Sequence, residues 1–191
     1  MRIGAVDWNH RGWVGGFYPE TMPQEWWLTY YSNEFDSVLV PAARWRGADG
    51  RQWCADTPAE FRFYLELPSP AAVEPLLELG DHLGARFGGI VARHGAEAAL
   101  PAPRRATVYR DAPQPGAGDG CCWRPGDGTR NCLLGILDCA VVPDRRTLST
   151  QIQAFAAQTD VSQGAVLLLD GAPPAIGLLQ DALLIAGLLG L

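Results

Sequence analysis

The amino-acid sequence predicts an α/β fold: a TIM-barrel-like parallel barrel, shortened to about seven strands, that closes with seven or stays open at a seam. Short apolar segments alternate with helix-like segments along the chain, an order typical of a parallel sheet with helices outside it. Seven segments have the character of strands, one fewer than an eightfold barrel needs. The 191 residues are 48% hydrophobic and 19% charged, a composition that predicts a single domain over residues 1–191 with one core.

The predicted strands are short apolar segments, and most of them end at or just before an Asp or a Pro. They cover residues 2–7, 37–41, 61–67, 87–92, 106–110, 132–137 and 165–169. The predicted helices cover residues 23–31, 71–83, 147–158 and 174–189. The first of these helices begins at Pro23, and proline is favoured in the first turn of a helix. In the second, leucines at 76, 77, 79 and 83 come close to helical spacing.

The stretch from residue 113 to 131 has the composition of turns and loops. Residues 115–120 read Pro-Gly-Ala-Gly-Asp-Gly and residues 125–128 read Pro-Gly-Asp-Gly. Repeated glycines also occur in phosphate-binding loops, but those loops lead directly into a helix. No helix-like segment follows either glycine run, so a nucleotide-binding loop has little support here.

The charged residues exclude several classes of function. All fifteen basic residues are arginine, so no lysine can form a Schiff base with a carbonyl substrate or with pyridoxal phosphate. The lysine of nucleotide-hydrolase P-loops is absent for the same reason. The net charge of −6 argues against nucleic acid as a partner, because phosphate binding needs a basic surface.

Targeting and cysteine patterns predict a reduced protein in a bacterial-type cytoplasm. The apolar stretch after Met1 and Arg2 is interrupted by Asp7, so it is too short for the apolar region of a secretory signal. The apolar segment 176–191 carries Gln180 and Asp181 and is shorter than a membrane span, so we expect a buried helix or one packed on a partner subunit. Five cysteines form an odd set without regular spacing, which indicates free thiols, and no Cys-x2–4-Cys pair predicts a zinc site.

Four aromatic motifs near the start share one register with a known family. Their sequences are Gly-Ala-Val-Asp-Trp at 4–8, Asn-His-Arg-Gly-Trp at 9–13, Gly-Gly-Phe-Tyr-Pro at 15–19 and Trp-Leu-Thr-Tyr-Tyr-Ser-Asn-Glu-Phe at 27–35. The chain here resembles the YecE-like family, domain of unknown function 72. Further similarity covers residues 58–63, 79–84 and 164–184. The resemblance implies a TIM-type barrel and no particular activity.

The resemblance also implies that part of the barrel is missing. In the family, a strand ending in Glu-x-Arg-His leads to a Trp, a helix, a strand and a second helix. Here residues 107–111 and Trp123 are followed only by loop-like sequence before Cys132. We therefore expect residues 113–131 to form a loop that replaces one lost β/α unit.

Most polar residues that the family directs into its cleft are exchanged in this chain. The Glu and Asn of the second strand correspond to Leu39 and Pro41, and the Lys of the third corresponds to Glu66. The Gln of the fourth strand and the Glu of the fifth correspond to Gly89 and Val108. An apolar side chain cannot transfer the proton that a carboxylate transfers. The resemblance thus implies that any family chemistry has been lost or replaced.

The polar residues left at the predicted strand ends are candidates for a site, because the carboxyl ends of barrel strands form the functional face. They are Asp7, Glu66, Arg110, Asp111, Asp138 and Asp170. The carboxylates could share a proton or bind a hard cation through oxygen. Each Asp could equally serve the turn or helix N-cap that follows a strand. Both interpretations stay open.

Three tryptophans and one histidine lie beside the same face. Trp8, Trp13 and Trp45 could stack on a sugar or a base, or could pack as the lip of the barrel. His10 lies in the loop after the first strand, where it could titrate near neutral pH or stay solvated. The three tryptophans complete the set of candidate ligand-binding residues, and His10 lies in a loop at the mouth of the cleft without being one of them.

The leading hypothesis is an uncharacterised, non-catalytic YecE-like barrel protein with a cleft for a small polar ligand or a partner. The alternative is a hydrolase or lyase that uses strand-end carboxylates, with or without a divalent cation, and Arg110 to hold an anionic substrate. A third hypothesis is a homodimer formed through the C-terminal helix or an open barrel edge. No cofactor, nucleic acid or membrane is predicted, and whether the protein is an enzyme stays open.

Overall fold

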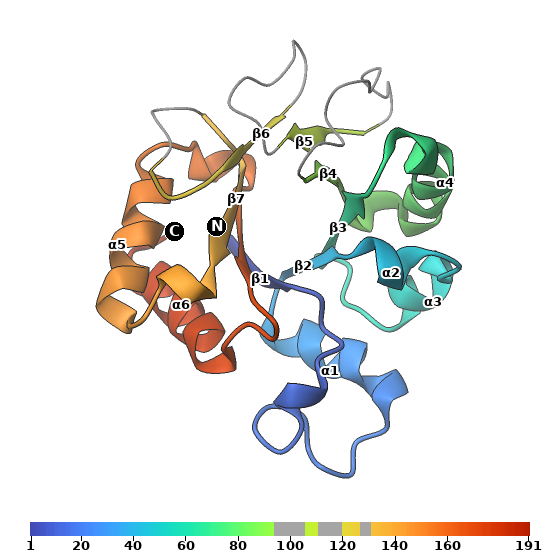
Figure 1. Ribbon diagram of the computed structural model, residues 1–191, viewed down its shortest axis with the longest axis horizontal. Coiled ribbons are helices and arrows are strands. Elements are labelled where there is room, and N and C mark those ends of the chain that lie inside the picture. Colours follow the sequence, from blue (N-terminus) through green and yellow to red (C-terminus); the bar gives the residue numbers. More distant parts are fainter. Residues whose placement is uncertain (94–105, 111–119, 127–130) are drawn as a thin grey trace.

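The computed structural model describes residues 1–93, 106–110, 120–126 and 131–191, and these residues form a closed barrel of parallel strands (Figure 1). The strands are β1 (Arg2–Val6), β2 (Ser37–Val40), β3 (Arg62–Leu67), β4 (Phe87–Ala92), β5 (Val108–Arg110), β6 (Gly120–Trp123), β7 (Leu134–Asp138) and β8 (Val166–Asp170). Each strand pairs with the next, and β8 returns to β1 with Arg2 opposite Val166 and Ala5 opposite Leu169.

The helices lie outside this barrel. They are α1 (Trp27–Glu34), α2 (Ala42–Trp45), α3 (Gly50–Ala55), α4 (Val73–Leu83), α5 (Arg145–Ala156) and α6 (Ile176–Leu188), with short 3-10 turns at η1 (Arg11–Trp13), η2 (Gln24–Trp26), η3 (Pro70–Ala72), η4 (Gly84–Arg86), η5 (Cys139–Val141) and η6 (Val161–Gln163). In Figure 1, α5 and α6 cover one side of the barrel and α3 and α4 the other. No helix in the described part of the chain is long and apolar enough to cross a membrane.

The predicted fold class is confirmed, but the strand count and the open seam need correction. The barrel has eight strands and closes without a seam. The additional strand, β6, lies inside residues 113–131, which the sequence predicted as a loop. The strand has only four residues and lies between two glycine-rich stretches of sequence, which is too short to show an apolar period, so the sequence pattern does not reveal it. Among the described residues, no helix lies between β4 and β7.

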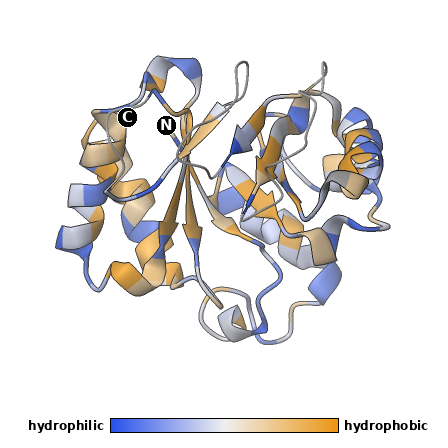
Figure 2. Cartoon of the chain, turned by 45° about the horizontal axis from the view of Figure 1, so that its top comes forward, coloured by the Kyte–Doolittle hydropathy of each residue, from blue (hydrophilic) through white to orange (hydrophobic). Residues whose placement is uncertain are grey.

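Two buried layers follow from the alternation of side chains along each strand. One set points into the barrel and packs together there: Val6, Leu39, Tyr64, Val91, Tyr109, Cys122, Leu134, Ile136, Val166 and Leu168. The other set points outward and packs under the helices, among them Ile3, Val38, Phe63 and Leu167. Figure 2 shows the hydrophobic residues concentrated on the central strands. This alternation decides which residue at each strand end faces the barrel axis.

The aromatic segment that opens the chain holds β1 and β2 together. The Tyr31 side chain is fully buried and stacks on Trp13, with ring centres 6.2 Å apart. Its hydroxyl accepts a hydrogen bond from the Ala5 amide at 2.7 Å and donates one to the Ser37 carbonyl at 2.9 Å. Burial raises the pKa of Tyr31 well above the ordinary tyrosine value, so the phenol keeps the proton it donates. The aromatic segment therefore holds β1 against β2, and β1 is the strand that leads into the candidate site.

Candidate functional site

The carboxyl-terminal mouth of the barrel is lined by the inward-facing residues that end or follow the strands. Glu66 lies two residues after Tyr64, Arg93 two after Val91, and Asp170 two after Leu168. Because side chains alternate along a strand, all three continue the inward-facing set. The predicted convergence of Glu66 and Asp170 on one end of the barrel therefore holds, and a basic residue stands between them.

Arg93 neutralises both of these carboxylates. Its Nη2 forms an ion pair with Asp170 Oδ2, and its Nη1 lies 3.8 Å from Glu66 Oε1. The three side chains are 17 to 24% exposed. Glu66 Oε2 also accepts a hydrogen bond from the Ala42 amide at 3.0 Å, which ties the group to the start of α2. This cluster joins β3, β4 and β8 across the mouth and leaves no isolated carboxylate among its members.

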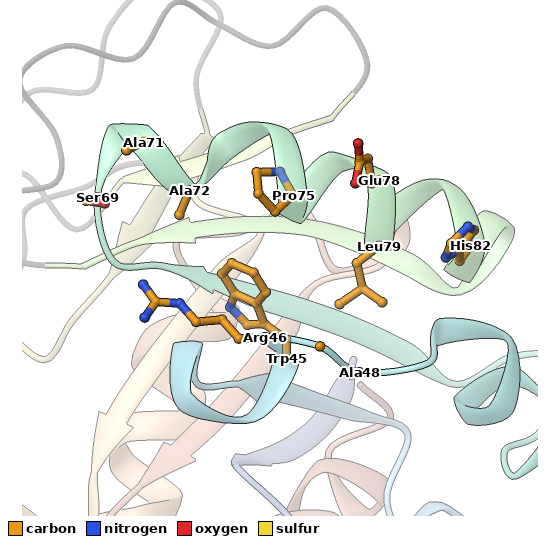
Figure 3. A pocket seen from close by; sticks show the side chains of 11 residues that line it. Trp45, Arg46, Ala48, Ser69, Ala71, Ala72, Pro75, Glu78, Leu79 and His82 are labelled. Atoms are coloured by element: carbon orange, nitrogen blue, oxygen red, sulfur yellow. The ribbon is translucent and has the colours of Figure 1, made fainter.

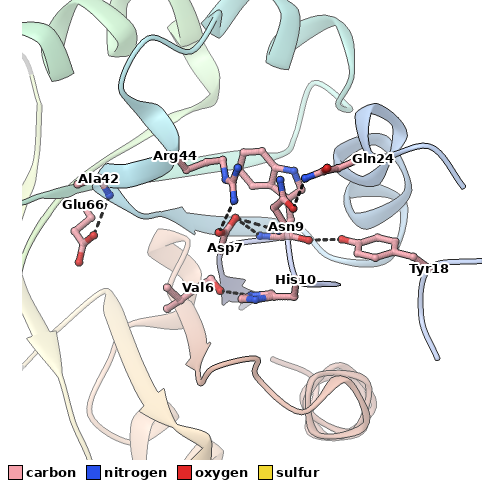
Figure 4. Close-up of polar contacts among 10 residues, drawn as sticks. Val6, Asp7, Asn9, His10, Tyr18, Gln24, Ala42, Arg44 and Glu66 are labelled. Atoms are coloured by element: carbon pink, nitrogen blue, oxygen red, sulfur yellow. Dashed lines mark hydrogen bonds and ion pairs between the residues drawn. The ribbon is translucent and has the colours of Figure 1, made fainter. Parts of the chain in front are cut away.

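Asp7 has a structural role at the end of β1. Its backbone has φ of 60°, a left-handed conformation that Asp tolerates better than most residues. Oδ1 accepts hydrogen bonds from the amides of Trp8 and Asn9 at 2.8 and 3.0 Å. Oδ2 pairs with Arg44 Nη2 at 3.3 Å (Figure 4). Both oxygens are therefore occupied, one by the turn and one by a guanidinium.

Asp138 and Arg110, the remaining charged candidates among the described residues, do not join this group. Asp138 is exposed and accepts a hydrogen bond from the Ala140 amide at 2.8 Å, as an N-cap does. Arg110 is only 6% exposed, and since Tyr109 points into the barrel, Arg110 points outward. Asp111 lies outside the described residues. The predicted ring of acids is thus, among the described residues, a set of carboxylates each bound by the turn that follows it or by an arginine.

The three candidate tryptophans are buried. Trp8, Trp13 and Trp45 are 5, 3 and 3% exposed. Trp13 Nε1 donates to the Pro174 carbonyl and Trp45 Nε1 to the Glu66 carbonyl, both at 2.8 Å. Trp8 meets Trp53 edge to face, with ring centres 5.2 Å apart. Of the two interpretations left open by the sequence, packing of the barrel lip describes these contacts.

A mouth cavity of about 390 Å³ lies between the loop after β1 and the loop after β8. Asp7, Asn9 and His10 line it on one side, Pro41 at the end of β2, and Gly171 and Pro173 on the other. His10 Nε2 donates to the Val6 carbonyl at 2.9 Å, since a carbonyl can only accept. In the tautomer that makes this bond, the other ring nitrogen, Nδ1, can accept a hydrogen bond. Asn9 Oδ1 accepts from Gln24 Nε2 at 2.7 Å, which leaves the Asn9 amide group to donate.

Sequence reasoning missed the two arginines that organise the mouth. Arg93 directly follows the strand 87–92, a strand end that the sequence pattern predicts, whereas Arg44 lies in α2, four residues after the end of β2. Neither arginine forms part of a catalytic motif, so no sequence signal marks it as a partner of the strand-end carboxylates. Their partners lie far away in the chain: Asp170 is 77 residues from Arg93, and Asp7 is 37 from Arg44.

The cysteines differ from the predicted set of reduced thiols. Cys121 in β6 and Cys132 before β7 form a disulfide. Cys54, Cys122 and Cys139 are free. The two bonded cysteines are eleven residues apart in sequence and meet only because β6 and β7 are neighbours in the barrel. In the part of the chain that the structure describes, no three His, Cys, Asp or Glu side chains are grouped to hold a metal ion.

Comparisons with known proteins agree with this fold. A family model described as "Protein of unknown function DUF72" matches residues 2–99. The crystal structure of a DUF72 family protein from Thermotoga maritima is similar to the barrel with a TM-score of 0.58. The similarity covers 96% of this chain and 98% of that one at 13% sequence identity, so it shows the fold alone. No curated protein matches the chain.

Proposed function

This chain belongs to the DUF72 family, whose function is unknown, and we propose that it is a non-catalytic barrel protein that binds a small polar ligand in its mouth cavity. The observation that carries this proposal is the cavity of about 390 Å³ beside Asp7, Asn9 and His10. Cavities of roughly 300 to 1,000 Å³ hold small ligands in many proteins. The cavity also lies at the carboxyl ends of the strands, where barrels of this type place their ligand sites.

The charges around the mouth favour a ligand without strong net charge. Asp7 is paired with Arg44, while Glu66 and Asp170 share Arg93. A dianion or dication would compete with these pairs rather than complete them. Asn9 offers a donor and His10 Nδ1 an acceptor, the combination that a hydroxyl or a carboxamide satisfies. Polyols, sugars and amides are therefore the expected class of ligand.

A binding measurement by nuclear magnetic resonance tests the proposal. We expect myo-inositol, glucosamine or glutamine to shift backbone amide signals of residues 6–12 and 171–172, and citrate, as the anionic comparison, to shift them least. The variant His10→Leu should weaken binding about five- to tenfold, because it removes one hydrogen bond. His82→Leu, on the exposed face of α4, is the matched control. The proposal fails if none of the three polar compounds shifts these signals, if citrate shifts them most, or if His10→Leu binds like the natural protein.

The alternative, a hydrolase or lyase that uses strand-end carboxylates, stays a prediction with less support. General acid or base catalysis needs a carboxylate that can exchange a proton with substrate. Asp7 and Asp170 already accept hydrogen bonds from backbone amides and pair with arginines. Conversion of any of the same compounds during the titration would favour the enzyme over the binding protein.

We also propose that the chain forms a homodimer through α6. Leu184 and Leu188 lie one helical turn apart and are 54 and 78% exposed. The described strands close into a barrel and leave no open edge, so of the two routes to a dimer that the sequence suggested, an open edge and the C-terminal helix, the helix is favoured. Light scattering should give twice the chain mass for the natural protein and one chain mass for Leu188→Glu. Trp26→Gln, which removes a different exposed apolar side chain, should not change the mass, and a monomeric natural protein contradicts the proposal.

A cytoplasmic location also stays a prediction from the sequence. The disulfide between Cys121 and Cys132 weighs against it, because reducing compartments keep thiols free. Counting the alkylated thiols of the protein in freshly lysed cells distinguishes a reduced chain from an oxidised one. Five alkylated thiols indicate a reduced chain, and three indicate a chain that contains the disulfide.

A further inference from the structure

A second cavity lies on the side of the barrel, away from the mouth cavity. It has a volume of about 480 Å³ and runs between residues 45–48, which follow β2, and helix α4 (Figure 3). We call it the α4 groove. None of its lining residues lines the mouth cavity, so a ligand in one does not occupy the other. Nothing in the proposed function uses this groove.

The wall of the α4 groove is apolar and firmly packed. Trp45, Ala72 and Leu79 are 3, 7 and 6% exposed, and Pro75 of α4 lies between the last two in the sequence. The Trp45 indole is held in place by its hydrogen bond to the Glu66 carbonyl, so its own polar atom needs no partner from a ligand. A ligand body in contact with this wall must therefore be apolar.

The two ends of the α4 groove differ in charge, with an arginine at one end and a glutamate toward the other. Arg46 is exposed at the end where Ser69 and Ala71 lie, and Glu78 and His82 stand toward the other end (Figure 3). In the part of the chain that the structure describes, Arg46 makes no ion pair. An anionic group is thus favoured beside Arg46 and disfavoured beside Glu78.

The length of the α4 groove favours an elongated ligand. Ala71 and His82 both line it, and eleven residues of helix rise about 16 Å. At the far end, α3 packs directly against α4: a Cβ atom built on Gly50 would lie 2.9 Å from Leu79 Cδ1 and 3.0 Å from His82 Cβ. The groove is therefore bounded there rather than continuous with the rest of the surface.

We propose that the α4 groove binds a small amphipathic carboxylate. The carboxylate pairs with Arg46, and an aryl or short alkyl body lies along Trp45, Pro75 and Leu79. Glu78 fixes the orientation, since it repels the anionic end. The inference rests on two features together, the apolar wall and the Arg46 cation, which has no ion-pair partner among the described residues, because either feature alone would accept many other ligands.

Titration with 4-phenylbutyrate tests this assignment by nuclear magnetic resonance. We expect it to shift backbone amide signals of residues 45–48 and 71–82. It should bind about fivefold more tightly than the neutral 4-phenylbutanamide, the effect of one exposed ion pair. The amine 4-phenylbutylamine should bind more weakly than the acid.

Three variants sharpen the result. Arg46→Gln should bring acid and amide to equal affinity, whereas Arg51→Gln, an exposed arginine on the neighbouring α3, should leave the fivefold difference unchanged. Ala71→Trp places a large side chain at an exposed position of the groove and should abolish binding of all three compounds. Thermal unfolding confirms that each variant is folded.

Several outcomes would overturn the assignment. They are an absence of shifts in the α4 groove with 4-phenylbutyrate, equal binding of acid and amine, and an Arg46→Gln variant that still prefers the acid. Shifts of the same signals on raising the protein concentration without any compound would assign the groove to a second copy of the chain. Binding in the mouth cavity is measured from the amide signals of other residues, 6–12 and 171–172. A negative result for the α4 groove therefore does not contradict the proposed function.

Discussion

Replacing Gly4 with alanine is expected to destabilise the barrel by about 3 kcal/mol or more, the upper range for overpacking a tight interior. Gly4 lies in β1, opposite Ser37 of β2. A Cβ atom built on Gly4 would overlap the Ser37 carbonyl oxygen and would lie 2.6 Å from its carbonyl carbon. These are backbone atoms of a paired strand, so they cannot move aside without breaking the pairing of β1 with β2.

Chemical denaturation followed by tryptophan fluorescence measures this loss. Gly177→Ala is the matched control, because nothing lies within 4 Å of a Cβ atom at that position of α6. The control should keep or raise the free energy of unfolding, by up to about 1 kcal/mol, since alanine favours a helix more than glycine does. Equal stability of the Gly4→Ala variant and the natural protein would show that the two strands can separate without cost.

The substitution Arg93→Met is expected to lower the free energy of unfolding by about 2 to 3 kcal/mol. It removes the cation between Glu66 and Asp170 and keeps an unbranched apolar side chain about as long as the aliphatic stem of the arginine. Breaking a fully buried ion pair costs roughly 3 to 5 kcal/mol, because the remaining charge stays unpaired. The expected loss is smaller here because the three side chains keep 17 to 24% of their surface in water.

Neutralising the two carboxylates should restore most of that stability. Adding Glu66→Gln and Asp170→Asn to Arg93→Met removes the unpaired charges, and both new side chains can still accept the amide hydrogen bonds from Ala42 and Gly171. Arg145→Met is the surface control: it breaks an ion pair with Asp181 in which the arginine is 66% exposed, and should change the free energy of unfolding far less than Arg93→Met does, because water screens an exposed pair. A triple variant no more stable than Arg93→Met alone would mean that the arginine acts through packing rather than charge.

Most elements of the barrel could be predicted because their patterns are local. The strand 87–92 coincides with β4, and residues 165–169 and 174–189 differ from β8 and α6 by one or two residues at each end. β6 could not be predicted in this way, because its four residues carry too short a pattern. It exists because Gly120 pairs with Tyr109 and Cys122 with Leu134, contacts that complete the barrel.

The candidate site was predicted in part. Asp7, Glu66 and Asp170 stand at strand ends as expected, but whether a strand-end Asp serves a ligand or its own turn depends on hydrogen bonds that sequence does not show. The orientation of Trp8, Trp13 and Trp45 could not be predicted either. An aromatic side chain near the mouth of a barrel can face solvent or pack against the protein, and the sequence does not distinguish the two. Here all three are buried against other parts of the chain.

The sequence by itself determined the family, the parallel barrel and the positions of most strands, because short-range alternation of apolar and polar residues and the aromatic motifs near the start carry that information. Only the tertiary structure decided the chemistry of the mouth. Arg93 reaches Asp170 across 77 residues of chain, and Cys121 reaches Cys132 because two strands become neighbours. Such pairings depend on the closure of the barrel, which no local pattern encodes.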